Sequence, residues 1–277
     1  MPDAAIAAAR RGLATDPWAV PPLGGAFDEA VAEGLAVLGL ADAAASSQAA
    51  RRSYEAHARL LREWGGAINL TAIREPAQVA RRHVCDSLSA VPALAGRLWP
   101  GAALLDLGSG SGYPGLPLLA ALPLSRLGLL DSVAKKARFL AVAGAAVRAA
   151  LPERSVSVEA IAERAEDLAE DPGHREAWDI VTARAVGSLA EVIELAMPLT
   201  REGGWVVAWK REQERGGLDA ELRDAGSIIR ATGGGRLHVV TVDAALLTGH
   251  RIVIVPKERA TPASYPRPPG ARRKRLR

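Results

Sequence analysis

Hydrophobic positions follow two different spacings along the chain, and the change falls near residue 100. Before it, apolar residues recur every three or four positions, which predicts amphipathic helices over 27–40, 46–70 and 75–94. Pro100 and Gly101 interrupt that spacing. After it, short continuous apolar runs alternate with spacers of helix length, and these runs are 103–108, 126–132, 156–161, 178–185, 203–210, 237–242 and 250–257.

Continuous apolar strands separated by helices are typical of a mostly parallel sheet that is covered on both faces. The last two runs lie close together, which predicts an antiparallel pair at one edge of the sheet. We therefore expect an α/β chain in four parts: a disordered N-terminal tail (1–26), a helical segment packed on the core (27–98), an α/β core (99–258) and a basic C-terminal tail (259–277).

The composition fits a soluble globular protein with a sizeable core, since 49% of the 277 residues are hydrophobic and 24% are charged. The formal net charge is only +4, but it is unevenly placed. The last eleven residues, RPPGARRKRLR, hold six Lys and Arg residues and no acid. Such a block attracts polyanions, although a solvated tail without a partner is the alternative.

Cys85 is the only cysteine, so no intramolecular disulfide is possible and a reducing cytoplasm is expected. We expect its side chain to be buried filler rather than a nucleophile. No stretch is long and apolar enough for a membrane helix, and the N-terminus lacks the apolar core of a secretory signal. The five histidines are scattered without metal-ligand spacing, so no metal is expected.

The stretch LLDLGSGSGYPGLPLL, at 104–119, places a glycine-rich turn directly after the first apolar run. Gly110, Gly112 and Gly115 match the pattern G-x-G-x-x-G, in which glycine permits positive φ angles and close approach of a ligand. Asp131 ends the next strand, where a carboxylate can accept hydrogen bonds from both hydroxyls of a ribose. A tight turn without a ligand is the alternative for the glycines alone.

The loop suits either a dinucleotide or S-adenosylmethionine, and two details favour the second. Pro114 and Pro117 stiffen the loop, and Pro114 lacks the amide that a pyrophosphate would use. Asp106 stands inside the strand before the first glycine, where its carboxylate can orient the loop or approach the amino group of a methionyl moiety.

Several short stretches together carry a more specific signal than the loop alone. They are NLTAIREP, RHVCDSL, LLDLGSGSGYPGLPL, LLDSVAKKARFL, RAEDL, VTARAVGSL and YPRPPGARRKR. In this order, between Tyr54 and Arg277, they resemble the RsmG/GidB family of bacterial ribosomal RNA small-subunit methyltransferases. The resemblance implies a class I, Rossmann-like methyltransferase sheet, S-adenosylmethionine as the cofactor, and methyl transfer to N7 of one guanosine in a loop of 16S ribosomal RNA.

The loop and the resemblance together indicate site residues. The cofactor-binding candidates are Gly108, Gly110, Tyr113, Asp131, Ser132, Val133, Ala165, Glu166 and Arg184. Among them, Ala165 and Glu166 would contact the adenine, and Arg184 would close the site near the methyl end. The candidates for positioning the reacting groups are Arg184, His83 and Asn69. The RNA-binding candidates are Arg74, Arg82, Lys210, Arg211, Arg272, Arg273 and Lys274.

The implied chemistry needs positioning more than proton transfer. Guanine N7 is unprotonated at neutral pH and has a free lone pair, so no general base is required. N7 faces the major groove, which is too deep and narrow to reach in paired A-form RNA. The guanine must therefore come from a loop or be splayed out of the stack.

Other interpretations stay open at this stage. The chain could methylate a small molecule, or could be a non-catalytic RNA-binding ribosome-assembly factor, and a nicotinamide dehydrogenase is a more distant alternative. Asn69 and Thr71 could cap the helix that begins near Pro76. His83 could satisfy a helix neighbour, and Arg184 could pair with Glu191 or Glu194. For the active protein we expect a monomer with 16S ribosomal RNA as its partner.

Overall fold

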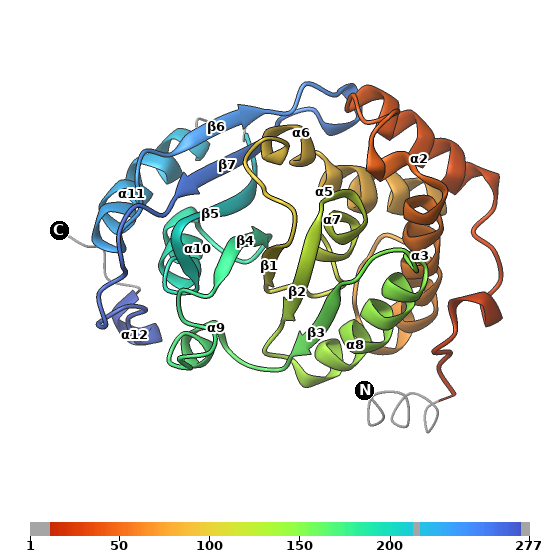
Figure 1. Cartoon of the computed structure of the whole chain (residues 1–277). Coiled ribbons are helices and arrows are strands. Elements are labelled where there is room, and N and C mark those ends of the chain that lie inside the picture. Colours follow the sequence, from red (N-terminus) through yellow and green to blue (C-terminus); the bar gives the residue numbers. More distant parts are fainter. Residues whose placement is uncertain (1–11, 213–216, 273–277) are drawn as a thin grey trace.

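A single seven-stranded sheet runs through the part of the molecule that the computed structural model describes (Figure 1). This part comprises residues 12–212 and 217–272 of the chain. The strands are β1 (Ala102–Leu107), β2 (Leu124–Leu130), β3 (Ser157–Ile161), β4 (Trp178–Arg184), β5 (Thr200–Arg211), β6 (His238–Thr241) and β7 (His250–Pro256). Their order is β3-β2-β1-β4-β5-β7-β6. The first five are parallel, and β7 pairs antiparallel with both β5 and β6. The mostly parallel, Rossmann-like sheet with an antiparallel edge is confirmed.

Helices cover both faces of this sheet. Those before the sheet are α2 (Gly25–Val37), α3 (Gln48–Ile68), α4 (Pro76–Val79), α5 (Asp86–Leu88) and α6 (Val91–Leu94), with a π-helical turn (Ala80–Cys85) that joins α4 to α5. Those between and after the strands are α7 (Gly115–Ala121), α8 (Ala134–Ala149), α9 (Ala165–Leu168), α10 (Leu189–Ala196), α11 (Gly217–Ala231) and α12 (Pro269–Arg272). Short 3₁₀ turns occupy Pro17–Ala19, Ala44–Ser46 and Ala245–Leu247.

The two faces of the sheet bury separate apolar clusters, which explains the continuous apolar strands. Leu104 packs into the cluster formed with α2, α3, α7 and α8, and the next residue, Leu105, packs into the cluster formed with α9, α10 and α11. Val206 and Val207 divide in the same way. Successive strand residues point to opposite faces, so a strand covered on both faces needs apolar residues at its odd and its even positions.

The N-terminal helices belong to the first of these clusters. Tyr54 of α3 is buried with Phe139 of α8, and Cys85 is buried against α2 with Sγ 3.8 Å from the carbonyl oxygen of Ala30. The expected burial of Cys85 is therefore confirmed. Burial raises the pKa of its thiol to about 12, so this sulfur is inert as a nucleophile at neutral pH.

Part of the segment before residue 27 lies along α3. The indole Nε1 of Trp64 donates to the carbonyl oxygen of Ala14 at 2.8 Å, and Nη1 of Arg59 donates to that of Val20 at 3.0 Å. Residues 12–26 of the tail expected in the sequence are thus held by side chains of the helical segment. Residues 1–11 lie outside the described part of the chain.

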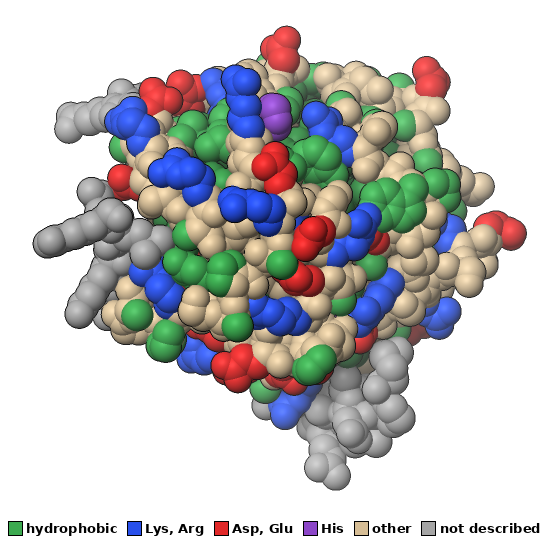
Figure 2. Space-filling view, turned by 60° about the vertical axis from the view of Figure 1, so that its left-hand side comes forward, with side chains coloured by type: hydrophobic (Ala, Val, Ile, Leu, Met, Phe, Trp, Pro, Cys, Tyr) green, Lys and Arg blue, Asp and Glu red, His purple; other side chains and the backbone are tan. Residues whose placement is uncertain are grey.

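Charges of both signs are interspersed on the side of the molecule that carries α9–α12. Figure 2 shows Lys and Arg side chains scattered among Asp and Glu side chains over this face, without one large patch of either sign. Within the described ranges, no helix is both long and apolar enough to cross a membrane.

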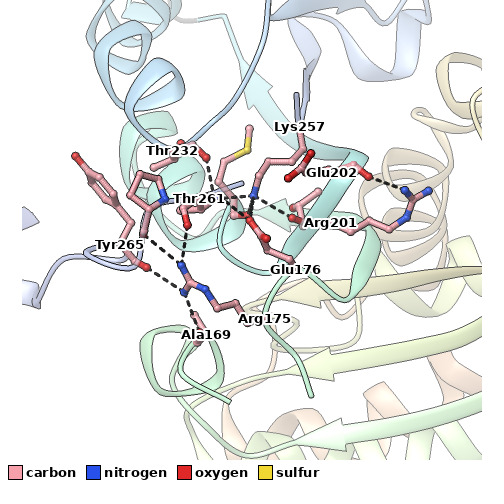
Figure 3. A network of polar contacts seen from close by, with 12 residues as sticks. Ala169, Arg175, Glu176, Arg201, Glu202, Thr232, Lys257, Thr261 and Tyr265 are labelled. Atoms are coloured by element: carbon pink, nitrogen blue, oxygen red, sulfur yellow. Dashed lines mark hydrogen bonds and ion pairs between the residues drawn. The ribbon is translucent and has the colours of Figure 1, made fainter. Parts of the chain in front are cut away.

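Residues 258–272 form a C-terminal strap that is anchored by two cations, the buried Lys257 and the half-buried Arg175 (Figure 3). Nζ of Lys257 donates to Glu176 Oε1 at 2.9 Å, to Thr261 Oγ1 at 2.6 Å and to the carbonyl oxygen of Met197 at 2.6 Å. The guanidinium of Arg175 donates to four carbonyl oxygens, those of Ala169, Thr261, Pro262 and Tyr265. A buried cation needs such partners, and here they fix the start of the strap.

Candidate functional site

The candidate site lies where the parallel strands end and the strand order changes direction. The chain passes from β1 to β2 and β3 on one side and returns to β4 and β5 on the other. Ligands of open α/β sheets bind outside the carboxyl ends of the strands at this switch point. The glycine loop after β1, Asp131 after β2 and Arg184 at the end of β4 all meet at this edge.

Three glycines of the loop adopt backbone conformations that side chains would oppose. The φ angles of Gly108, Gly110 and Gly112 are +68°, +57° and +85°. A Cβ at Gly108 would lie 2.7 Å from Cγ2 of Val186, and one at Gly112 would lie 2.8 Å from Nε2 of His57. The loop can therefore turn this tightly only with glycine at these positions.

Asp106 orients the glycine loop from inside β1. Its Oδ2 accepts from Oγ of Ser109 at 2.6 Å and from the amide of Gly115 at 3.0 Å, and its Oδ1 accepts from Oγ1 of Thr182 at 2.8 Å. Burial raises the pKa of this carboxyl to about 6 against the opposing effect of these hydrogen bonds. Of the two roles that the sequence left open for Asp106, the geometry supports the first.

Asp131 links the ends of β1 and β2 and keeps acceptor capacity for a ligand. Its Oδ2 accepts from the amide of Gly110 at 3.0 Å, and its Oδ1 accepts from the amide of Val133 at 2.9 Å. A carboxylate has about four lone-pair sites, so two amides leave room for further donors. Beside it, Ser132 is exposed and Val133 is 37% exposed. An acceptor for hydroxyls next to an exposed apolar side chain fits a nucleoside.

Arg184 is held by the N-terminal helices rather than by its own side of the sheet. Its Nη1 donates to Oδ2 of Asp86 at 2.8 Å and to the carbonyl oxygen of Arg82 at 3.2 Å, and its Nη2 lies 3.4 Å from Nδ1 of His83. The alternative pairing with Glu191 or Glu194 is wrong. Glu191 forms a capping box with Ser188 at the start of α10, and Glu194 binds Arg267 of the strap.

Tyr113 is stacked between two histidines behind the glycine loop. Its ring centroid lies 4.2 Å from that of His57 and 4.8 Å from that of His83. His57 donates from Nε2 to the carbonyl oxygen of Ser111 at 2.7 Å. Burial lowers the pKa of His57 to about 3 and that of His83 to about 4, so both rings are neutral at neutral pH. The hydroxyl of Tyr113 is buried without a hydrogen-bond partner among the described residues.

Replacing Tyr113 with phenylalanine should raise the free energy of unfolding by about 1 kcal/mol, because it removes a buried hydroxyl that is unsatisfied in the protein. Tyr54 offers a matched control, since its buried hydroxyl donates to the carbonyl oxygen of Ala45 at 3.0 Å. Tyr54→Phe should therefore lower stability by a similar amount. Urea unfolding of both variants measures this, and equal losses would mean that the Tyr113 hydroxyl has a partner after all.

The structure brings some of the predicted residues together and separates others. His83 and Arg184 are neighbours, whereas Asn69 is exposed at the end of α3 in the left-handed conformation, with φ of 54°. Asn69 thus caps the C-terminus of α3, and Glu75 caps the start of α4. The expectation that Asn69 and Thr71 cap the helix near Pro76 is wrong, because Oγ1 of Thr71 instead lies 2.9 Å from Nε2 of His83.

The adenine-side candidates lie at the start of α9, where the strap returns. Ala165 is buried, and the carboxylate of Glu166 accepts a hydrogen bond from Nη2 of Arg272. Although burial raises the pKa of Glu166, this guanidinium lowers it below the usual value for a glutamate. Arg272 is therefore an internal partner of a cofactor-binding candidate.

The RNA-binding candidates fall into three groups. Arg74, Arg82 and Arg211 are exposed. Lys210 is largely committed to internal contacts, since its Nζ donates to Glu221 Oε1 at 2.6 Å and to the carbonyl oxygen of Gly187 at 2.8 Å. Arg272 is paired with Glu166 as above, and the predictions for Arg273 and Lys274 fall outside the described residues.

Sequence reasoning missed Asp86, His57 and His250 as members of this site. The spacing of His83 and Asp86, three residues apart on one helix, places both on one face and could have indicated Asp86. No local signal pointed to His57 or His250. Within the described part of the chain, no three His, Cys, Asp or Glu side chains are grouped so that they could hold a metal ion.

Comparison with known proteins covers the glycine loop, Asp131 and Arg184. The family model GidB, described as rRNA small subunit methyltransferase G, matches residues 51–230. A Ribosomal RNA small subunit methyltransferase G of Dehalococcoides mccartyi is 39% identical over 218 residues, which are 78% of this chain and 87% of that protein. One of Roseiflexus castenholzii is 39% identical over 215 residues, 78% of this chain and 86% of that protein.

A solved structure with a low sequence identity to this chain adds nothing to the family assignment. A precorrin-6y methyltransferase of Geobacter metallireducens aligns with a TM-score of 0.40 and 17% identity, covering 69% of this chain and 92% of that one. The family match spans the glycine loop, Asp131 and Arg184, and the identity to full-length relatives extends over most of the chain. The chain therefore belongs to the GidB family of rRNA small subunit methyltransferase G proteins.

Proposed function

We propose that this protein transfers a methyl group from S-adenosylmethionine to N7 of a guanosine in a loop of 16S ribosomal RNA. The observation that carries the proposal is that one family match includes the loop, Asp131 and Arg184, which converge at the ligand edge of the sheet. S-adenosylmethionine supplies the methyl group, which it carries on a sulfonium sulfur.

The residues at this edge suit the parts of that cofactor. Asp131 would accept hydrogen bonds from the ribose hydroxyls with its spare lone pairs, and Val133 would cover one face of the adenosine. Ala165 and Glu166 would bound the adenine side, and Arg184 the methyl side. The remaining candidates are Gly108, Gly110, Tyr113 and Ser132, of which Tyr113 is buried behind the loop.

The side chains around Arg184 suit a reaction that depends on alignment. His83 is neutral at neutral pH, so it presents a hydrogen-bonding ring without adding a charge near the acceptor base. The lone pair of guanine N7 attacks directly, so no residue has to remove a proton. The protein needs to hold the base within about 3–3.5 Å of the methyl carbon and in line with the departing sulfur.

We propose that the exposed arginines nearest the site hold the RNA phosphates. Arg82 lies in the π-helical turn, and its own backbone carbonyl oxygen accepts a hydrogen bond from Arg184. Its exposed side chain is therefore next to the candidate site. Arg211, at the end of β5, and Arg74, before α4, are also exposed. Binding through phosphates should weaken steeply as the salt concentration rises. We further propose that the protein works as a cytoplasmic monomer.

The direct test is transfer of labelled methyl groups from S-adenosylmethionine to small ribosomal subunits that lack the modification. Naked 16S RNA and free guanosine nucleotides serve as parallel substrates, and cleavage at N7-methylguanine maps the labelled position. We expect label at a single loop guanosine. Tight binding of S-adenosylmethionine with no label on any RNA would contradict the proposal and favour a small-molecule substrate.

A further inference from the structure

His250 occupies a place in this site that its position in the sequence does not suggest. It begins β7, and because β7 runs antiparallel to β5, its first residue lies at the edge where the parallel strands end. His250 is directly opposite Arg211 in the strand register and is only 7% exposed. Its Nδ1 lies 2.7 Å from Oδ1 of Asp86, which begins α5 directly after the π-helical turn that holds His83.

The neighbours of His250 determine which ring nitrogen carries the proton. Nε of Arg211 donates to Nε2 of His250 at 2.7 Å, so Nε2 must offer its lone pair. In the neutral ring the proton then resides on Nδ1 and is donated to Asp86. Arg211 therefore fixes the tautomer that Asp86 requires.

Asp86 receives donors on both oxygens. Oδ1 accepts from His250, and Oδ2 accepts from Nη1 of Arg184 at 2.8 Å. Its backbone carbonyl also accepts from Nε1 of Trp209 at 2.8 Å. Asp86 is 6% exposed, and its carboxylate cannot rotate without breaking one of these contacts. Its plane, and with it the donor position of Arg184, is thus set by His250 from the opposite side.

An arginine side chain has many rotamers, and ordering it has an entropic cost. The peptide after Arg184 adds a constraint, since Ala185 has a positive φ of 58°. Resting on the proposed function, we propose that His250 is a positioning residue for the methyl transfer. Acting through Asp86, it holds the Arg184 guanidinium in the place required at the methyl side of the cofactor.

Two substitutions separate this role from simple packing. His250→Phe keeps the ring volume and removes both hydrogen bonds, whereas His250→Asn places an amide donor where Nδ1 stands and removes only the acceptor for Arg211. His238, exposed on the neighbouring strand β6, gives the matched control His238→Phe. If the His250→Phe variant does not fold, His250→Gln takes its place. The glutamine amide lies one bond further out than that of asparagine, so it cannot take the position of Nδ1 and does not restore the hydrogen bond to Asp86.

Full-length variants are compared in the ribosomal-subunit assay, with kcat and the KM for each substrate measured separately and folding checked by thermal unfolding. We expect His250→Phe to lower kcat about 10- to 100-fold, since small displacements of a positioned group have effects of this size. His250→Asn should retain kcat within about threefold of the wild type even if its KM for RNA rises, because Arg211 has lost an anchor.

Equal kcat values for the wild type and a folded His250→Phe variant would overturn the inference, and so would an asparagine variant as slow as the phenylalanine one. A slow His238→Phe control would assign the effect to general damage of the sheet edge and would equally overturn it. Failure of the proposed function is a different result, because the wild type itself would then label no RNA.

Discussion

Asp131→Ala is expected to weaken the binding of S-adenosylmethionine by about 100-fold or more, because the ribose hydroxyls would lose a charged acceptor and each such hydrogen bond contributes about 1.5–3 kcal/mol. The change also leaves the amides of Gly110 and Val133 without their partner, so the loop loses the contact that ties it to β2. Titration calorimetry with the purified protein measures the dissociation constant.

The matched control for this variant is Asp243→Ala, which removes an exposed carboxylate between β6 and β7 and should leave binding unchanged. Thermal unfolding of the ligand-free variant separates loss of binding from loss of the fold. A dissociation constant for Asp131→Ala within a few fold of the wild type would place the ribose elsewhere and would contradict the assignment of this carboxylate.

The free energy of unfolding should fall by about 3 kcal/mol as the pH is lowered from 6.5 to 4.5, because the unfolded state binds protons that the folded state does not bind. The pKa of His57 is about 3 and that of His83 about 4 in the folded protein, both lowered by burial from 6.5. Both rings therefore take up protons only on unfolding in this range, which favours the unfolded state as the pH falls. Asp106 opposes them, since its pKa is raised to about 6 by burial and the folded state binds its proton first.

His57→Gln tests this balance. The glutamine amide can still donate to the carbonyl oxygen of Ser111 but does not titrate, so His83 and Asp106 should nearly cancel between pH 4.5 and 6. Urea unfolding at a series of pH values measures the slope, and the exposed His238→Gln serves as the control. If the His57→Gln slope equals that of the wild type, His57 is not the buried neutral ring described above.

Much of the fold is encoded in local patterns and could be predicted from them. The apolar runs are continuous because both faces of the sheet are covered, and each predicted run overlaps a strand of the structure. The glycines of the loop are needed for positive φ angles and for space, both of which are properties of the residue itself. Asp131 could be located because it follows a strand directly, and its place beside the loop follows from the adjacency of β1 and β2.

Other parts of the site were decided only by the tertiary structure. Arg184 pairs with Asp86, 98 residues away, and Asp86 pairs with His250 across 164 residues. Likewise, Lys210 and Arg272 carry the same charge as Arg82 but are paired with internal carboxylates. The sequence by itself determined the strands, the loop and the residues that end the strands, because these depend on neighbours along the chain. The partner of each charged side chain depends on which distant elements pack beside it, including the reversal of β7 that brings His250 to the ligand edge, and only the folded chain decides that.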